Sequence, residues 1–213
     1  MEFLKLEETI LNDFLPDTLG NAKTDPPFIV ANTKSVSYDD LMTQCIVPVF
    51  AKDNETTIPH DVFIDLIHNA AIETFELISQ PQIRVSHEVK GRIPEAINKP
   101  VKELLPNEKT LYYERMMFNI DIPNIMTEIN GNTLNLSIGG VRAYNTENLY
   151  SRKSLEKFKI YIGFKNKVCS NMCISTDGFS MELRVNSMDE LFNKAKSLFE
   201  NYNSDNDIKL YND

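Results

Sequence analysis

The sequence predicts an α+β fold in which an antiparallel sheet of about four to six strands packs against two main helices. Between positions 111 and 185, apolar and polar side chains alternate in successive segments, as they do in strands with one buried face. These segments follow one another without intervening helices, which is typical of antiparallel sheets rather than of βαβ units. Helical periodicity occurs before and after them, at 59–78 and 188–202.

Individual strands are predicted from period-two patterns. Met116, Phe118, Ile120 and Ile122 share one face of a strand, and the polar residues between them take the other, which indicates a sheet with one wet face. Asn130-Gly131 is a strong signal for a two-residue hairpin turn. Further strands are predicted at 82–92, 133–138, 157–165, 168–175 and 181–185, and the first of these places His87 on the apolar face with Ile83, Val85 and Val89.

The two main helices carry recognisable boundaries. For the first, Thr57 is the predicted N-cap, Pro59 suits the first turn, and Ser79-Gln80-Pro81 ends the helix. Ser187 is the predicted N-cap of the last helix, and Glu190 completes a capping box. If both helices cover the apolar face of the sheet, a set of five residues becomes buried: Phe118, Leu136, Ile162, Leu66 and Leu198.

The chain is predicted to form one main domain with extensions. Residues 1–38 read as an N-terminal helix at 3–15 followed by an extended arm, in which 27–32 could pair as an edge strand. A single α+β domain spans 39–203, and 204–213 form a frayed tail. Inside the domain, 44–52 is predicted to be a short strand and 93–110 a long ordered loop.

Composition excludes several classes of protein. There is no run of 18 apolar residues, so no membrane span and no membrane partner are expected. The three cysteines, Cys45, Cys169 and Cys173, are predicted to be reduced thiols in the cytoplasm, with no disulfide. Cys169 and Cys173 would lie about 13 Å apart on a strand, so no metal and no cofactor are expected. The oligomeric state is left open.

Charge is distributed unevenly along the chain, whose net charge is −9. Residues 1–80 hold 14 acidic and 4 basic side chains, whereas 81–185 hold 11 acidic and 15 basic ones. The net charge argues against non-specific binding of nucleic acid by the whole surface. The basic segment 142–167 nevertheless allows a local anionic partner, and a solvated basic face is the plainer alternative.

Four stretches of the sequence carry a family resemblance: RVSHEVKGRIPEAINKPVKELL, LYYERMMFNIDIP, GNTLNLSIGGVRAYNTENLY and EKFKIYIGFKNKVCSNMCISTDG. They resemble a family without assigned function that is carried on conjugative elements and prophages of gut bacteria. The similarity spans roughly residues 28 to 200. A fainter similarity, through 168–172, connects the chain to phage/plasmid-like proteins. The resemblance implies an accessory protein of a mobile element, and it implies no catalytic residue.

The first functional hypothesis is a non-catalytic module that binds single-stranded nucleic acid or a host protein. It depends on a basic segment interleaved with aromatic rings, because cations with stacking rings are what single strands require. Phe158 and Phe164 fall on the buried face, which leaves Tyr144, Tyr150 and Tyr161 free to stack. The candidate nucleic-acid-binding residues are Arg142, Tyr144, Tyr150, Arg152, Lys153 and Lys159.

The alternative hypothesis is an enzyme with a polar cleft between the helices and the sheet. Its catalytic candidates are His87, Glu114, Arg142 and Asp177, and the same polar cluster includes Arg115, Asn145 and Asn171. A hydrogen-bonded core histidine is the plainer interpretation of His87. The glycine pair before Arg142 could cradle an anion, although a β-bulge or sheet bend is the more frequent cause of such pairs. Convergence of these side chains on one pocket would favour the enzyme.

Overall fold

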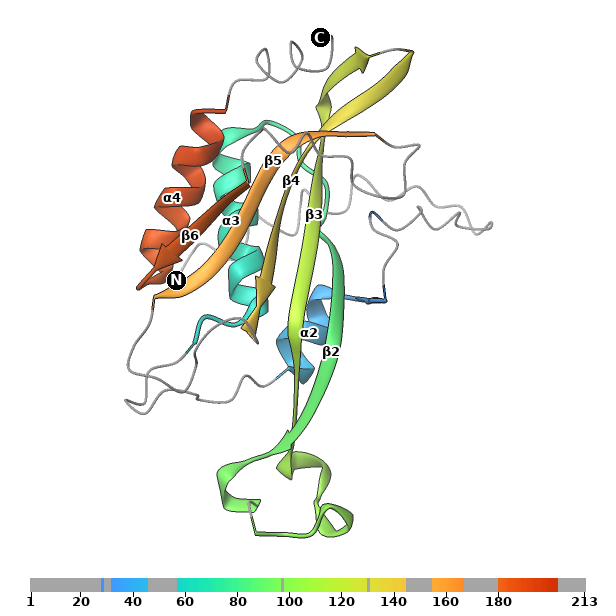
Figure 1. Ribbon diagram of the computed structural model, residues 1–213, viewed down its shortest axis with the longest axis vertical. Coiled ribbons are helices and arrows are strands. Elements are labelled where there is room, and N and C mark those ends of the chain that lie inside the picture. Colours follow the sequence, from blue (N-terminus) through green and yellow to red (C-terminus); the bar gives the residue numbers. More distant parts are fainter. Residues whose placement is uncertain are drawn as a thin grey trace, which may run out of the picture.

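The computed structural model describes residues 28, 32–45, 57–96, 98–129, 131–144, 155–166 and 180–202. Over these residues the chain forms an antiparallel six-stranded sheet with helices on one face, so the predicted α+β class is confirmed (Figure 1). Of the predicted segments, 3–15 and 168–175 lie outside the described residues, as do the greater parts of 27–32 and 44–52.

The sheet is a meander in which every strand pairs with its neighbours in sequence, in the order β1-β2-β3-β4-β5-β6. Gly131 adopts a φ of 76° and Ile129 pairs with Asn132, which confirms the predicted hairpin turn. The six strands are β1 (Lys34–Val36), β2 (Gln82–Arg92), β3 (Lys109–Ile129), β4 (Asn132–Ala143), β5 (Glu156–Asn166) and β6 (Ser180–Val185).

Three α-helices accompany the sheet in the described part of the chain: α2 (Tyr38–Gln44), α3 (His60–Thr74) and α4 (Met188–Glu200). The helix α4 begins at the predicted cap, because the Ser187 side chain accepts a hydrogen bond from the Glu190 backbone N–H. The predicted capping box is not completed, because the Glu190 carboxylate accepts from the Asn186 backbone N–H rather than from that of Ser187. In contrast, Pro59 occupies the N-cap of α3 without a side-chain cap, so the predicted cap at Thr57 is wrong. The helix α3 also ends at Thr74, four residues earlier than expected.

The main core lies between the sheet and the two long helices. Phe118, Leu136, Ile162 and Leu198 are buried there as predicted, whereas Leu66 is half-buried at its margin. Phe63 of α3 sits at the centre, with its ring 5.3 Å from that of Phe118 and 4.7 Å from that of Phe158. Aromatic rings at such separations attract each other beyond the burial of their area. This contact fixes α3 on the middle strands.

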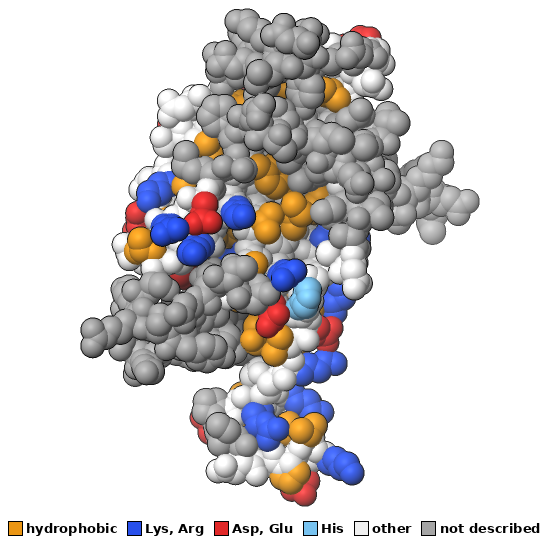
Figure 2. Space-filling view, viewed as in Figure 1, with side chains coloured by type: hydrophobic (Ala, Val, Ile, Leu, Met, Phe, Trp, Pro, Cys, Tyr) orange, Lys and Arg blue, Asp and Glu red, His pale blue; other side chains and the backbone are white. Residues whose placement is uncertain are grey.

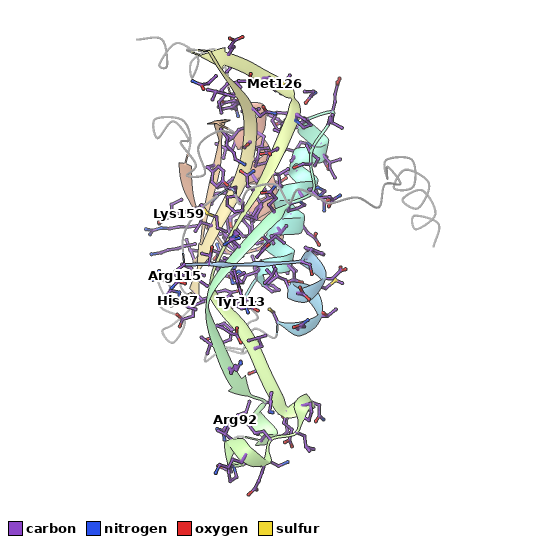
Figure 3. The ribbon with its side chains drawn as sticks, turned by 90° about the vertical axis from the view of Figure 1, so that its right-hand side faces the viewer. His87, Arg92, Tyr113, Arg115, Met126 and Lys159 are labelled. Atoms are coloured by element: carbon purple, nitrogen blue, oxygen red, sulfur yellow. The ribbon has the colours of Figure 1, made fainter. Side chains whose placement is uncertain are left out.

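The opposite face of the sheet, here called the open face, is turned away from α3 and α4 (Figures 1 and 3). Strand register assigns residues to it, because directly opposite residues share a face. The alternation predicted that this whole face is exposed to water, but only part of it is. A polar group at its upper end is buried, consisting of Asn119, Asn135, Ser137, Tyr161 and Lys165, and Phe28 is buried near Lys165.

The strands β2 and β3 continue beyond the rest of the sheet as a two-stranded arm. The pairing of β4 with β3 stops at Arg115, and the pairing of β1 with β2 stops at Val85. Among the described strands, residues 88–92 of β2 and 109–113 of β3 therefore pair only with each other. The arm projects downward in Figure 1. At its tip, the predicted ordered loop contains three short 3₁₀ turns, η1 (Pro94–Ala96), η2 (Val101–Glu103) and η3 (Pro106–Glu108).

The glycine pair Gly139-Gly140 forms neither a bulge nor an anion cradle, so both interpretations are wrong. Each glycine pairs regularly, with Asn119 and Phe118 respectively. A Cβ at Gly140 would lie 2.6 Å from the Phe63 ring and 2.7 Å from the Phe118 ring, and one at Gly139 would overlap the Tyr161 hydroxyl. The glycines therefore make room for aromatic side chains on both faces. The register shift in β3 lies instead between Ile122 and Met126, a segment that contains Pro123.

We expect Gly140→Ala to lower the free energy of unfolding by about 1–3 kcal/mol, because the added methyl group overpacks the aromatic core. Urea denaturation of the wild type and the variant would measure this change. Gly131→Asn is the matched control, since asparagine tolerates the positive φ of that exposed turn. A Gly140→Ala protein as stable as the control would show that Phe63 can move away from the sheet.

Candidate functional site

A group of basic side chains occupies the lower, exposed part of the open face. Lys159 on β5 is exposed and lies opposite Val141 and Glu182. Lys157 lies opposite Arg184. Arg115 on β3 is exposed on the same face. These four cations, Arg115, Lys157, Lys159 and Arg184, are called the basic face. Figure 2 shows Lys and Arg side chains gathered over β5 and β6, at the left of the view, beside an apolar patch.

Three members of the basic face are not neutralised. In the described part of the chain, the side chains of Arg115, Lys157 and Lys159 make no hydrogen bond or ion pair. Only Arg184 has an acidic partner, Glu182, at 3.2 Å. Lys157 and Arg184 are directly opposite each other, and like charges in that position destabilise a sheet. The arrangement therefore costs stability that an ion-paired surface would not.

His87 lies at the edge of this face, not in the core, so its predicted burial is wrong. Its φ of 57° is rare for a residue other than glycine, and the strand pairing is interrupted at this position. The interruption changes which face successive side chains take. Tyr113 points toward the helices and is buried, whereas His87 and Arg115 project on the open side with Lys159 (Figure 3). The ring nitrogen Nδ1 of His87 is 3.1 Å from the Ser86 hydroxyl oxygen.

Arg142 lies on the helix-facing side of the sheet and is only 1% exposed. Its guanidinium donates to the Ile58 carbonyl oxygen at 2.6 Å and forms an ion pair with Glu156. The Glu156 carboxylate also accepts a hydrogen bond from the Ile58 backbone N–H. The guanidinium stacks 4.1 Å from the centroid of Phe158. Arg142 therefore attaches the segment before α3 to the sheet and is inaccessible to a ligand on the surface.

His60, the first residue of α3, belongs to the same buried cluster. Its Nε2 is 2.8 Å from the Tyr113 carbonyl oxygen, and its ring stacks on Tyr144 with a centroid distance of 4.4 Å. Burial lowers the pKa of His60 to about 3, and the nearby Arg142 charge acts in the same direction. The imidazole is therefore neutral at pH 7 and donates from Nε2.

The upper, buried part of the open face is a polar network centred on Asp121. Its carboxylate oxygen Oδ1 accepts hydrogen bonds from Asn119 and Ser137, both at 2.7 Å, and lies 3.6 Å from Lys165 Nζ. Burial raises the pKa of Tyr161 well above its ordinary value, so its hydroxyl stays protonated and donates to the Phe118 carbonyl oxygen at 2.9 Å. Because these groups satisfy one another, the network stabilises the sheet.

The sequence-predicted site residues do not form one cluster. Tyr144 and Tyr161 are 1% and 5% exposed, so the expectation that they are free to stack is wrong. Arg142 is in the core, Lys159 is on the basic face, and half-buried Glu114 makes no described polar contact. His87 and Arg142 therefore do not meet in a cleft. The remaining candidates, Tyr150, Arg152, Lys153 and Asp177, lie outside the described residues, as do Asn145 and Asn171.

Within the described ranges, no group of three or more His, Cys, Asp or Glu side chains is placed to hold a metal ion. Cys45 is a free thiol whose pKa burial raises to about 11, so it is protonated at pH 7. Cys169 and Cys173 are outside the described residues. Among the helices that the structure describes, none has the length and apolarity needed to cross a membrane.

A family model with the description "Domain of unknown function, B. Theta Gene description (DUF3871)" matches residues 13–213. The chain belongs to the DUF3871 family. Searches of curated proteins and of solved structures find no match to it. Family membership agrees with the resemblance to a family without assigned function. The basic face is the exposed feature of this DUF3871 protein that is suited to bind a ligand.

Three cations of the basic face, Arg115, Lys157 and Arg184, were not among the nucleic-acid-binding candidates, and Arg115 was named only for the enzyme hypothesis. The signal that could have found them is the parity of each strand. On β5, Lys157 and Lys159 are out of phase with the buried Phe158 and Ile160, so they must share the other face. The same argument places Arg142 in phase with Leu136 and Ile138 on the buried face of β4.

Proposed function

We propose that this protein is a non-catalytic accessory protein that binds single-stranded nucleic acid on the basic face. The single observation that supports it is a set of three cations whose side chains form no described ion pair, Arg115 on β3 and Lys157 and Lys159 on β5, on the open face to either side of β4. The resemblance to families of conjugative elements and prophages supports a role in the cytoplasm with the nucleic acid of a mobile element.

Charge distribution favours a polyanion as the ligand. The chain carries a net charge of −9, yet four cations and one carboxylate, Glu182, lie together on this face, on β3, β5 and β6. Opposite strands place such side chains about 5 Å apart, and residues two apart on a strand follow at about 7 Å. A chain of phosphates can bridge charges at these separations, and it would relieve the repulsion between Lys157 and Arg184.

The contacts are expected to reach the phosphates rather than the bases. The described aromatic rings of the predicted binding segment, Tyr144, Phe158, Tyr161 and Phe164, are all buried. Binding would therefore be electrostatic and largely independent of sequence, because phosphate contacts position a strand without reading its bases. Met117 and Val141, partly exposed on the same face, add apolar contact area.

The enzyme alternative lacks a comparable observation. It requires His87, Arg142 and Asp177 to share a cleft, but Arg142 is enclosed by Ile58, Glu156 and Phe158 on the other side of the sheet from His87. Asp177 lies outside the described residues. A host protein with an acidic surface is the remaining alternative for the basic face, and the experiment below separates it from nucleic acid.

Fluorescence anisotropy with a labelled single-stranded DNA at low salt tests the proposal. We expect binding in the micromolar range that weakens with salt, because each phosphate contact releases a counterion. Arg115→Gln/Lys159→Gln should weaken binding roughly tenfold, about 1.4 kcal/mol. It should also reduce the slope of log affinity against log salt by about 1.4, since each lost contact contributes about 0.7.

The matched control is Lys102→Gln/Lys109→Gln, which removes the same charge from exposed positions on the arm, away from the basic face. This variant should bind as the wild type does. Equal weakening by both double variants would show that net charge alone matters and would contradict a localised site. No binding of single-stranded DNA or RNA at micromolar protein would exclude nucleic acid and favour an acidic protein partner.

A further inference from the structure

The strand β6 forms one edge of the described sheet and is hydrogen-bonded only to β5 there. It lies at the margin of the sheet in Figure 1, with α4 behind it. Glu182 and Arg184 on this strand are exposed. An edge strand presents a row of backbone N–H and C=O groups that can pair with another strand, and proteins usually protect or use such edges.

One hydrogen bond shows which backbone groups of β6 face outward. Lys194 Nζ on α4 donates to the Arg184 carbonyl oxygen at 3.0 Å. A carbonyl oriented toward β5 would be satisfied by the ladder, so the Arg184 carbonyl lies on the outer side of the strand. In an antiparallel ladder the N–H and C=O of one residue point the same way and alternate along the strand. Glu182 and Arg184 therefore both present their backbone groups outward, and Leu183 presents its own toward β5.

The charges of β6 are complementary to those of a second β6 in a single antiparallel register. Directly opposite residues in a sheet lie on the same face. In a pair of β6 strands, Glu182 must therefore lie opposite an open-face residue of the second copy. Pairing centred on Leu183 places Glu182 opposite Arg184 of the second copy, twice. Centring the twofold axis on Glu182 or on Arg184 places two like charges opposite each other, which is destabilising.

We propose that two copies of the chain associate through β6, antiparallel and about a twofold axis at Leu183. In this register Glu182 and Arg184 form hydrogen-bonded pairs across the interface, because their backbone groups face outward. The same residues form two cross-strand ion pairs, and the two sheets join into one. Self-complementary surfaces of this kind are characteristic of twofold dimers.

A groove beside β6 accommodates the second copy. It has a volume of about 530 Å³ and runs between β6 and α4, with Leu183 and Leu198 contributing its apolar lining. Leu183 faces its counterpart at the axis, where opposite side chains come closest. Lys194 has to release the Arg184 carbonyl when the strands pair, but it keeps its ion pair with Glu190 at 2.8 Å.

Sedimentation velocity without nucleic acid, from about 1 to about 100 µM protein, tests this dimer independently of the proposed binding function. We expect a concentration-dependent monomer–dimer equilibrium. Glu182→Arg alone places like charges opposite each other twice and should weaken dimerisation at least tenfold. Arg184→Glu alone should do the same. The double exchange Glu182→Arg/Arg184→Glu restores opposite charges and should return the dissociation constant to within about threefold of the wild type.

Two further variants sharpen the result. Lys194→Met removes the group that competes for the Arg184 carbonyl, so it should strengthen dimerisation. Lys90→Glu, a charge reversal on the arm, should leave the dissociation constant unchanged. A chain that stays monomeric at all concentrations contradicts the proposal. A dimer that is insensitive to both single charge reversals, or is not restored by the double exchange, also contradicts it.

Discussion

Glu156→Gln should lower the free energy of unfolding by about 3–5 kcal/mol, because it removes the carboxylate that pairs with the buried Arg142 guanidinium. The substitution keeps the size of the side chain and an oxygen that can accept from the Ile58 backbone N–H. The loss therefore reports the buried charge, since Arg142 is 1% exposed. Urea denaturation, with the midpoint and the slope both compared to those of the wild type, measures it.

Two variants test the physical cause of that loss. Glu182→Gln breaks an exposed ion pair, in which the Glu182 side chain is 40% exposed and that of Arg184 is 60% exposed. This substitution should lower the free energy of unfolding by no more than about 1 kcal/mol. Arg142→Met/Glu156→Leu replaces the whole buried pair by apolar side chains of similar size. It should be more stable than Glu156→Gln alone, because the guanidinium that has lost the Glu156 carboxylate is removed from the core as well. A double variant as unstable as the single one would contradict this explanation.

Stability should also fall with pH below about 6.5 because of His60. Its pKa is about 3 in the folded protein, compared with about 6.5 for an unperturbed histidine, so between these values only the unfolded chain binds the proton. The stabilisation is complete above pH 6.5 and is lost progressively as the pH falls toward 3. The slope contributed by one such group is about 1.4 kcal/mol per pH unit. From pH 6.5 to 5 the loss amounts to roughly 2 kcal/mol.

Urea denaturation at several pH values checks this dependence. His60→Gln keeps a donor for the Tyr113 carbonyl and removes the titration, so its stability should depend less on pH in this range by about 1.4 kcal/mol per unit. His87→Gln is the matched control, because it makes the same substitution at an exposed histidine outside the buried cluster. An unchanged slope in His60→Gln would show that other groups cause the acid sensitivity.

Much of this fold could be predicted because its strands are strictly amphipathic. The alternation on β3, β4 and β5 and the Ser187 cap of α4 depend only on neighbouring residues, and they predicted these strands and the start of the helix correctly. The helix α2 was missed because seven residues are too few to show a period. Its signal is local instead: the Ser37 side chain accepts from the Asp40 N–H, and the Asp40 carboxylate accepts from the Ser37 N–H.

The candidate site was harder to predict because its geometry depends on interruptions of the pattern. The positive φ of His87 changes which side chains face the helices, and period-two alternation assumes that no such change occurs. Arg142 was assigned to the surface by its charge, although its parity places it in the core. Glu156 and Ile58, which are distant from it in sequence, help to compensate for its burial. Such partners can be recognised only once the chain is folded.

The meander order of the sheet has a consequence for how the chain folds. Each pairing from β2 to β6 joins strands that are consecutive in sequence. Forming these hairpins closes comparatively short loops, and proteins dominated by such contacts fold faster than sheets built from distant strands. The strand β1 differs, because α2 and α3 separate it from β2. We therefore expect the β2–β5 hairpins to form early, and the attachment of β1 and the docking of α3 through Ile58 and Arg142 to complete the fold.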